Sequence, residues 1–285
     1  LRHPARVESV ETTAAGFTIR GAGLILRTRR LILATGGTAL PKSGSDGHGY
    51  HIARSLGHTT TRIFPALVPL VLNRDCPLRA LAGLTLPVRV ELRSGTSRRL
   101  VAFTDSTLCT HFGLSGPAVM DISRHYLDAR HTDPGAHLVA SFLPDTERHH
   151  MEKELLDLGP HRVTTRLRAM LPVRLADALC AHAGVMPETT GASLRKDTRR
   201  ALLDAVLDFR LPVTGDRGFT HAEVTAGGVP LDEIDTKTMG SRRCPGLHLC
   251  GEILDADGRI GGYNFQWAWA SGHIAGLSAA QSLHG

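Results

Sequence analysis

Apolar and polar positions alternate over short stretches at the start of the chain, a pattern typical of β-strands. Three such stretches, separated by turns, lie at 6–10, 16–20 and 23–28 and predict an antiparallel meander. A continuous apolar run at 30–34 then predicts a buried strand. That strand ends in Thr35-Gly36-Gly37, so β-structure leads directly into a glycine-rich turn.

A second glycine-rich loop, at 41–50, leads into a helix predicted from about residue 48 to 56. The loop lacks the Gly-Lys-Ser/Thr of a Walker loop and does not fit G-x-G-x-x-G, so it is not a recognisable phosphate loop. The segment 64–70 carries two prolines and is expected to be extended.

The middle of the chain changes from strand-like to helix-like spacing near residue 143. We predict a β-barrel-like part at 71–143 and a small helical bundle at 144–218, inserted between two pieces of one α/β domain, 1–70 and 219–285. The predicted strands are 84–92, 99–104 and 137–142, and the predicted helices are 145–158, 162–170, 173–182 and 193–207, with a further helix starting at Gly116-Pro117.

The end of the chain combines a short strand, a glycine-rich turn with carboxylates, and a helix. The strand is 246–250, the turn runs from Gly251 to Gly262, and the helix runs from Asn264 to about Ser282. A helix N-terminus after such a turn favours a polar, partly anionic ligand. The alternative is a structural corner whose glycines only satisfy backbone geometry. Small residues spaced by three and four predict a smooth helix face that packs closely on a sheet: Ala268, Gly272, Ala275, Gly276 and Ala279.

Composition narrows the class of protein. The chain has 285 residues, of which 42% are hydrophobic, enough for one large domain or two smaller ones. No apolar run approaches the length of about 20 residues that spans a membrane. Five scattered cysteines without a C-x-x-C pair argue against a disulfide framework or a zinc site and favour a cytoplasmic location. The net charge of +6 could favour an anionic partner, but an arginine-rich genome would explain it equally well.

Several motifs in the last third of the chain make a family resemblance specific. They are Ala222-Glu223-Val224-Thr225 with Gly227-Gly228, Gly251-Glu252 with Asp255, Gly261-Gly262-Tyr263-Asn264, and Gln266-Trp267-Ala268-Trp269. With Ala34-Thr35-Gly36-Gly37 and Gly113-Leu114-Ser115-Gly116, the chain resembles the aminoacetone-oxidase-type, or NAD(P)/FAD-dependent, oxidoreductases. The resemblance implies a glutathione-reductase-type, Rossmann-like FAD domain interrupted by a barrel and helical insert.

One feature departs from that family. Its members begin with a strand, G-x-G-x-x-G and a helix, and Gly21-Ala22-Gly23 lacks both the third glycine and the helix. We therefore expect an N-terminally truncated chain whose first βαβ unit is missing. Its FAD site would be incomplete, because that unit carries the main pyrophosphate site.

The resemblance also implies which residues lie at the flavin. The turn after the first buried strand would pass close to the cofactor, and the helix opening at Asn264 would direct its dipole at the isoalloxazine. His111 and Tyr263 are weak candidates for a catalytic proton donor, since a surface histidine and a packed loop aromatic are the simpler interpretations. The predicted cofactor contacts are Thr35, Gly36, Gly37, Gly251, Glu252, Asp255, Gly261, Gly262, Tyr263, Asn264 and Phe265.

Two functional hypotheses and one non-enzymatic alternative follow. In the first, FAD transfers a hydride between a small-molecule substrate and NAD(P)H. In the second, the reduced flavin acts on a base in structured RNA held by the basic helices of the insert. The third possibility is an inactive remnant, and the oligomeric state is left open. The basic helical residues, which otherwise form ordinary solvated faces, are Arg162, Arg166, Arg168, Arg195, Lys196, Arg199 and Arg200.

Overall fold

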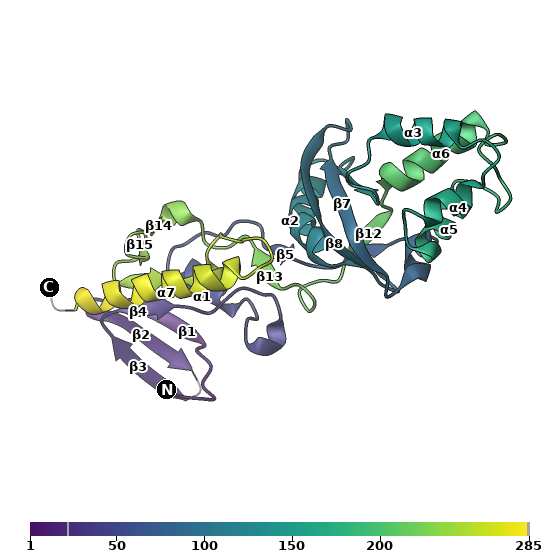
Figure 1. Cartoon of the computed structure of the whole chain (residues 1–285). Helices are drawn as coiled ribbons and strands as arrows, with labels where there is room; N and C mark the ends of the chain where they lie inside the picture. Colours follow the sequence, from purple (N-terminus) through teal and green to yellow (C-terminus); the bar gives the residue numbers. More distant parts are fainter. Residues whose placement is uncertain (22, 284–285) are drawn as a thin grey trace. The chain divides into compact units, whose positions relative to one another are not determined.

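The computed structural model describes residues 1–21 and 23–283 and divides the chain into two compact units (Figure 1). Unit 1 comprises Leu1–Ala66 and Gly218–Gly285, and unit 2 comprises Leu67–Arg217. Unit 1 is therefore built from both ends of the chain, with unit 2 inserted between them.

Unit 1 begins with a three-stranded antiparallel meander of β1 (Ser9–Thr13), β2 (Gly16–Gly21) and β3 (Leu24–Thr28). The first strand starts three residues later than its sequence pattern predicts. The reason is the pairing with β2, whose register runs from Ser9 opposite Arg20 to Thr13 opposite Gly16.

A second sheet of unit 1 has the order β14-β15-β16-β4. Its last pair is parallel, because Leu31–Leu33 of β4 lie opposite Leu247–Leu249 of β16. Two further strands, β5 and β13, pair with each other in antiparallel fashion. The remaining elements of unit 1 are β5 (Phe64–Ala66), β13 (Val224–Ala226), β14 (Ile234–Asp235), β15 (Gly240–Ser241), α1 (His48–Ser55), α7 (Tyr263–Gln281), and the 3₁₀ turns η1 (Pro41–Ser43), η3 (Leu231–Glu233) and η4 (Gly251–Ile253).

The last helix packs on the parallel strands through small residues. Its fully buried positions are Ser271, Ala275 and Ala279, which recur every four residues along one face of α7. Gly272 and Gly276 are only half-buried. The predicted small-residue face is therefore present, but its centre is the serine–alanine row rather than the glycines.

Unit 2 contains a seven-stranded sheet with the order β11-β10-β7-β8-β9-β6-β12. Helix α2 packs against β7 and β8, while α3 to α6 follow the sheet in sequence. The elements are β6 (Leu70–Leu72), η2 (Pro77–Leu81), β7 (Thr85–Arg93), β8 (Arg99–Cys109), β9 (Gly113–Ser115), α2 (Pro117–Thr132), β10 (His137–Ser141), α3 (Arg148–Asp157), α4 (Val163–Arg168), α5 (Val173–His182), α6 (Lys196–Leu207), β11 (Phe209–Arg210) and β12 (Val213–Asp216).

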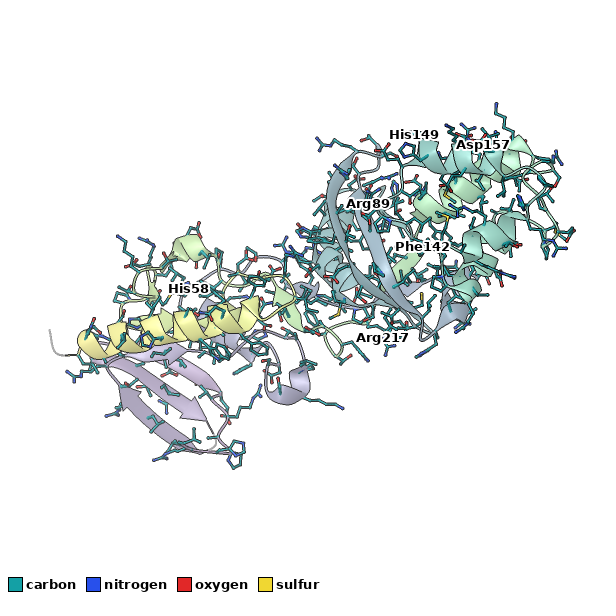
Figure 2. The ribbon with its side chains drawn as sticks, viewed as in Figure 1. His58, Arg89, Phe142, His149, Asp157 and Arg217 are labelled. Atoms are coloured by element: carbon teal, nitrogen blue, oxygen red, sulfur yellow. The ribbon has the colours of Figure 1, made fainter. Side chains whose placement is uncertain are left out.

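The sheet and the helices of unit 2 share one hydrophobic core. Phe142, at the end of β10, meets Phe209 of β11 edge to face with ring centroids 5.9 Å apart (Figure 2). The predicted border near residue 143 falls inside this unit, because β11 and β12 return from the helical region to pair with β10 and β6.

Helix boundaries in unit 2 differ from the predicted ones where polar side chains form turns. The helix predicted from residue 193 begins at Lys196, because Ser193 Oγ accepts the Thr190 amide at 3.0 Å and closes a turn. Among the described residues, no helix is both long and apolar enough to cross a bilayer.

The core of unit 2 predicts a large cost for removing Leu138, which is fully buried on β10. Leu138→Ala should lower the free energy of unfolding by about 2–5 kcal/mol, because it removes apolar contacts and leaves a cavity. Leu156→Ala on α3 is the matched control, since that leucine is 57% exposed. Urea unfolding followed by circular dichroism measures both. Equal effects of the two substitutions would contradict the assigned core.

Candidate functional site

The predicted turns meet because the strands that precede them are parallel. The carboxyl ends of β4 and β16 lie at the same edge of the sheet, so the 35–37 turn and the η4 turn emerge side by side. A Cβ at Gly37 would overlap Thr225 Oγ1 and Glu252 Oε1. Residues that are 188 and 215 positions apart in the sequence therefore pack within one small region.

Thr225 of β13 is the polar centre of this region. Its Oγ1 accepts hydrogen bonds from the amides of Thr38 at 2.7 Å and Ala39 at 2.9 Å, and its own amide donates to Glu252 Oε1 at 3.0 Å. Thr225 is 1% exposed, so these bonds are shielded from water. The motif around Thr225 did not predict this role as a hydrogen-bond acceptor. The available signal was a hydroxyl in an otherwise apolar strand ahead of Gly227-Gly228.

Glu252 is a largely buried acid at the centre of the predicted cofactor region. Burial raises its pKa above the ordinary range, and the hydrogen bonds from Thr225 only partly oppose that shift. One carboxylate oxygen is committed to the Thr225 amide. The prediction that this carboxylate accepts hydrogen bonds from cofactor hydroxyls therefore concerns its other oxygen, Oε2.

The glycines of the first turn have an internal reason to be glycine. A Cβ at Gly36 would lie 2.5 Å from Ser45 Oγ, and one at Gly37 would strike Thr225 and Glu252. Thr35 in turn packs against Gly49 of α1. The predicted reason was close approach of a flat ligand, whereas the structure fills these spaces with the protein's own side chains. Contact of Thr35, Gly36 and Gly37 with a cofactor remains a prediction.

The start of α7 is open. Gly262 is the N-cap residue with φ 92°, and a Cβ placed there would meet nothing within 4 Å. No side chain of the described residues caps this helix, and its first hydrogen bond runs from the Gln266 amide to the Gly262 carbonyl at 2.9 Å. The amides of residues 263–265 precede that bond, so they form a donor set at the positive end of the helix dipole.

Two side chains fix the loop that leads into α7. Asn264 accepts the Gly258 amide at 2.8 Å and donates to the Gly258 carbonyl at 3.0 Å. Trp267 Nε1 donates to the Gly251 carbonyl at 3.2 Å, which joins the helix to η4. Asp255, another predicted contact, donates its amide to Val229 O at 2.8 Å. The Asn264 side chain is thus hydrogen-bonded to the protein, while the backbone amide of Asn264 belongs to the open donor set.

Exposed aromatic side chains surround this opening. Tyr263, Phe265 and Trp269 are 65%, 68% and 69% exposed, and the rings of Phe265 and Trp269 stack with centroids 6.0 Å apart. Trp267 packs against the core of unit 1. The two tryptophans therefore point in different directions, as their spacing on a helix predicts.

The two catalytic candidates lie in different units. Tyr263 is exposed at the start of α7 in unit 1. His111 is exposed in unit 2, where its carbonyl accepts Arg79 Nε at 2.8 Å and its ring meets Phe112 edge to face. Both roles remain predictions.

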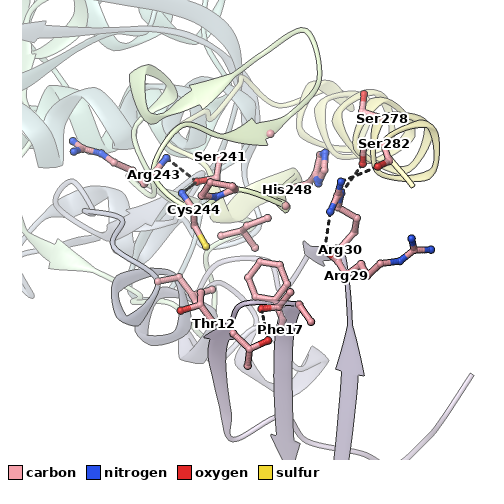
Figure 3. Close-up of a pocket in the computed structure, with 18 of the residues that line it drawn as sticks. Thr12, Phe17, Arg29, Arg30, Ser241, Arg243, Cys244, His248, Ser278 and Ser282 are labelled. Carbon is pink, nitrogen blue, oxygen red and sulfur yellow. Dashed lines mark hydrogen bonds between the residues drawn. The ribbon is translucent and has the colours of Figure 1, made fainter. Parts of the chain in front are cut away.

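A separate hollow of about 940 Å³ lies at the opposite ends of the parallel strands (Figure 3). Arg30 precedes β4 and donates to Ser282 Oγ and to the Ser282 carbonyl, both at 2.7 Å, at the C-terminus of α7. His248 of β16 also lines the hollow. Burial and the nearby Arg30 charge lower the pKa of its imidazole.

Ser241, which lines this hollow, belongs to a buried relay of three side chains. His58 Nδ1 lies 2.7 Å from Glu233 Oε2, and His58 Nε2 lies 2.7 Å from Ser241 Oγ. Ser241 Oγ also accepts the amides of Arg243 and Cys244 at 3.0 and 2.8 Å. The two amides occupy the lone pairs of the Ser241 oxygen, so this hydroxyl is not free to act as a nucleophile. The relay therefore has a structural role: it connects the end of α1 to the β14–β15 hairpin.

Glu233 is held ionised within this relay. Burial raises its pKa, but hydrogen bonds from Thr59 and His58 outweigh burial and hold the pKa below its ordinary value. The side chains of His58 and Glu233 are 0% and 5% exposed. The relay is therefore a shielded polar contact, and solvent screens it little.

The basic helices of unit 2 carry less free charge than their sequences indicate. Three of the seven basic residues pair with acids: Arg166 with Glu154 at 2.8 Å, Arg168 with Asp177 at 2.7 Å and Arg199 with Glu152 at 3.4 Å. These helix faces therefore bear mixed charge in the described part of the chain.

A family model described as the HI0933-like protein Rossmann domain matches residues 1–278. The chain belongs to this family. It is an FAD-binding Rossmann family, which agrees with the α/β architecture and with the expected flavoprotein class.

Curated relatives extend over most of the chain. A ribosomal RNA dihydrouridine synthase of Escherichia coli is 34% identical over 274 residues, which cover 95% of this chain and 66% of the relative. A 3-dehydro-bile acid delta(4,6)-reductase of Clostridium scindens is 35% identical over 280 residues, covering 97% of this chain and 68% of the relative. A ribosomal RNA dihydrouridine synthase of Haemophilus influenzae is 34% identical over 258 residues, covering 89% and 61%.

These comparisons narrow the predicted family. The chain spans about two thirds of the length of the curated relatives that it matches. The matches support an NAD(P)/FAD oxidoreductase-type family and not aminoacetone oxidase in particular. For the HI0933-like family member described here, FAD is therefore the indicated cofactor class.

The hydrogen bonds of Thr225 predict a large effect of a nearly isosteric change. Thr225→Val should lower the free energy of unfolding of unit 1 by about 2 kcal/mol or more, because it leaves the buried amides of Thr38 and Ala39 without an acceptor. Tryptophan fluorescence during urea unfolding measures this, since both tryptophans lie on α7. Thr12→Val, at an exposed threonine of unit 1, is the control. A loss of unfolding free energy no larger than that of the control would contradict the stabilising role of the Thr225 hydrogen bonds.

The relay predicts a pH-dependent contribution of Glu233. Because its folded pKa lies below the unfolded value, its stabilisation is complete above the unfolded pKa and is lost as the pH falls through the folded pKa. At pH 7, Glu233→Gln should cost about 1.5–3 kcal/mol. The difference between wild type and variant should shrink below about pH 4. Glu8→Gln, at an exposed acid of unit 1, is the control. A difference that does not depend on pH would exclude an ionised Glu233.

Proposed function

We propose that this protein is an FAD-dependent oxidoreductase that transfers a hydride between the flavin and a small-molecule substrate, with NAD(P)H as the electron donor. The observation that carries this proposal is the open N-terminus of α7, placed beside the turns that follow the parallel strands. Bound FAD supplies a carrier that accepts and delivers a hydride.

The residues at this edge fit a flavin. Amides of Tyr263, Asn264 and Phe265 would donate to the electron-rich edge of the ring, where the helix dipole favours negative charge. Gly261 and Gly262 leave the approach to those amides open. Thr225 holds the backbone of residues 38–39 in place through its hydroxyl, and Glu252 in turn accepts the Thr225 amide. In the same proposal Thr35, Gly36, Gly37, Gly251, Glu252 and Asp255 are further cofactor neighbours.

The names of the relatives indicate a reaction class. One relative makes dihydrouridine in ribosomal RNA, and another is a delta(4,6)-reductase of a 3-dehydro-bile acid. Dihydrouridine is uridine with two hydrogens added across the carbon–carbon double bond beside a carbonyl. We therefore propose a carbon–carbon double bond conjugated with a carbonyl as the substrate group.

Structured RNA is the second candidate substrate, because two of the three relatives described above are named for ribosomal RNA. The pairing of Arg166, Arg168 and Arg199 with acids reduces the free positive charge that such a partner would meet. The basic residues of these helices for which no acidic partner is described are Arg162, Arg195, Lys196 and Arg200, within residues 23–283.

Titration of the purified chain with FAD tests the cofactor proposal. We expect a shifted flavin absorption band, quenched flavin fluorescence, and bleaching by NAD(P)H under anaerobic conditions. Gly262→Ala should weaken FAD binding about tenfold or more, because it adds a methyl group at the N-cap of α7, where the approach to the first amides is open. Gly57→Ala is the matched control. Gly57 has φ 93° and Gly262 has φ 92°, and at both positions an added Cβ would meet no atom within 4 Å. A chain that takes up no FAD would contradict the proposal.

The substrate class requires separate measurements on the FAD-loaded protein. Oxidation of the reduced flavin by a cyclic enone, at a rate insensitive to salt, supports a small-molecule substrate. Oxidation by structured uridine-containing RNA, with binding that weakens steeply as salt rises, supports the second candidate. A reduced flavin that reacts with neither class would contradict the proposed reaction.

A further inference from the structure

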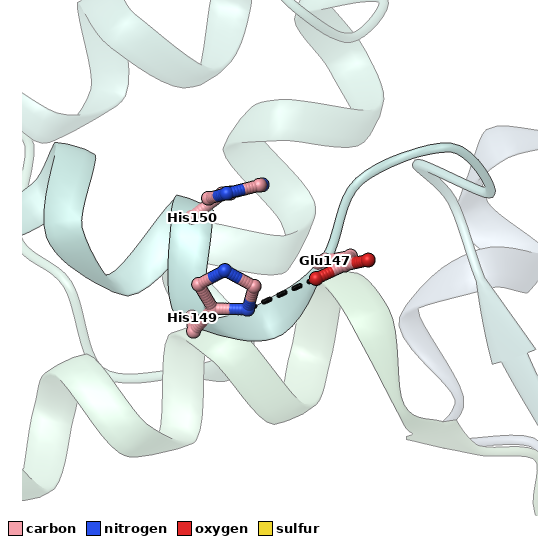
Figure 4. Close-up of side chains that lie close together, drawn as sticks. All are labelled: Glu147, His149 and His150. Atoms are coloured by element: carbon pink, nitrogen blue, oxygen red, sulfur yellow. Dashed lines mark ion pairs between the residues drawn. The ribbon is translucent and has the colours of Figure 1, made fainter.

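Two histidines and a glutamate lie together at the start of α3 in unit 2 (Figure 4). His149 Nδ1 is 3.1 Å from Glu147 Oε2, and the rings of His149 and His150 have centroids 3.9 Å apart. One ligand atom from each of the three side chains lies within 4.8 Å of the other two. We propose that this cluster binds a divalent transition-metal ion of the zinc class.

The spacing suits such an ion. Zinc binds imidazole nitrogen and carboxylate oxygen at about 2.0–2.2 Å, so two ligands of a tetrahedral ion lie about 3.3 Å apart. The separation of 3.1 Å between Glu147 and His149 is already close to that value. His150 offers a ring nitrogen within 4.8 Å of the other two ligand atoms, and rotation of its exposed side chain would bring that nitrogen to the ion.

The donor set selects the metal. Two imidazole nitrogens and one carboxylate favour zinc, cobalt, nickel or copper over magnesium and calcium, which prefer oxygen ligands. Three protein ligands also leave one position of a tetrahedral ion for water or an anion. That position is accessible, because Glu147 and His149 line a hollow of about 840 Å³.

Neighbouring charges permit the site. Arg148 lies between the ligands in the sequence, next to His149, which is labelled in Figure 2. Its guanidinium pairs with Asp204 of α6 at 2.7 Å and is held there. The positive end of the α3 dipole opposes a cation, and the Glu147 carboxylate at the N-cap offsets it. No side chain of the described residues caps α3, so a metal joining Glu147 to His149 and His150 would also hold its first turn.

A cobalt titration of the untagged chain tests the site. We expect one equivalent of Co²⁺ to give visible absorption bands that Zn²⁺ abolishes and Mg²⁺ leaves unchanged. His149→Ala and His150→Ala should each weaken Co²⁺ binding about tenfold or more, and Glu147→Gln should weaken it because a charged ligand is lost. His161→Ala is the matched control, an exposed histidine of the same unit that lies outside the cluster.

Thermal unfolding supplies an independent measurement. Zn²⁺ should raise the unfolding temperature of the wild-type chain and of His161→Ala, but not that of His149→Ala, because a ligand stabilises only the state that binds it. The proposal is overturned if the wild type binds no Co²⁺ at concentrations up to about 1 mM. It is equally overturned if the two histidine variants bind Co²⁺ as tightly as the control.

Discussion

The parallel pairing of β4 with β16 is the constraint on which unit 1 depends. Two parallel strands end at the same edge, so the turns that follow Leu33 and Leu249 must emerge together. Helix α7 then packs across both strands through Ser271, Ala275 and Ala279. Its N-terminus therefore opens next to those turns, which is the arrangement that makes this edge suitable for an anionic ligand.

Two glutamates of unit 1 have pKa values that are shifted in opposite directions. Glu252 accepts the Thr225 amide beside the η4 turn, but burial, together with the nearby Asp257 charge, raises its pKa. Glu233 receives bonds from Thr59 and His58, and its pKa is lowered. Hydrogen bonds and the neighbouring His58 outweigh burial at Glu233, whereas burial outweighs the Thr225 hydrogen bonds at Glu252. The Glu252 carboxyl is thus more easily neutralised than an ordinary glutamate, whereas Glu233 is held as an anion.

Several charged side chains of unit 2 pair with one another. Glu91 of β7, which is 6% exposed, is surrounded by Arg89, Arg93 and Arg99, and Arg93 also binds Asp208 at 2.6 Å. Local ion pairs likewise occupy several helix arginines. A net charge counted along a sequence therefore overestimates the charge that a partner would meet. The exposed Glu147–His149–His150 cluster is a different kind of feature, since its donors face solvent.

The amino-acid sequence by itself determined the class of structure and much of its segmentation. The helix predicted at 173–182 matches α5, and the order of motifs from Ala34 to Trp269 indicated an FAD-type oxidoreductase family, which the family match supports. Local signals were sufficient there, because helix periodicity and glycine-rich turns depend on neighbouring residues. Strand ends were less accurate: β8 runs to Cys109, five residues beyond its predicted end, because pairing with β7 continues to Leu108.

Only the tertiary structure decided what the individual residues do. Gly37 is glycine because Thr225 and Glu252 occupy its side-chain space, a contact between segments that no local pattern links. The His58–Glu233 pair and the arginine pairs of unit 2 depend in the same way on long-range packing. The Glu147–His149–His150 cluster depends on a different kind of information: cysteine spacing does not indicate it, whereas the start of a helix brings two adjacent imidazoles and a carboxylate together. Sequence neighbours set the elements, and packing between distant segments set the site.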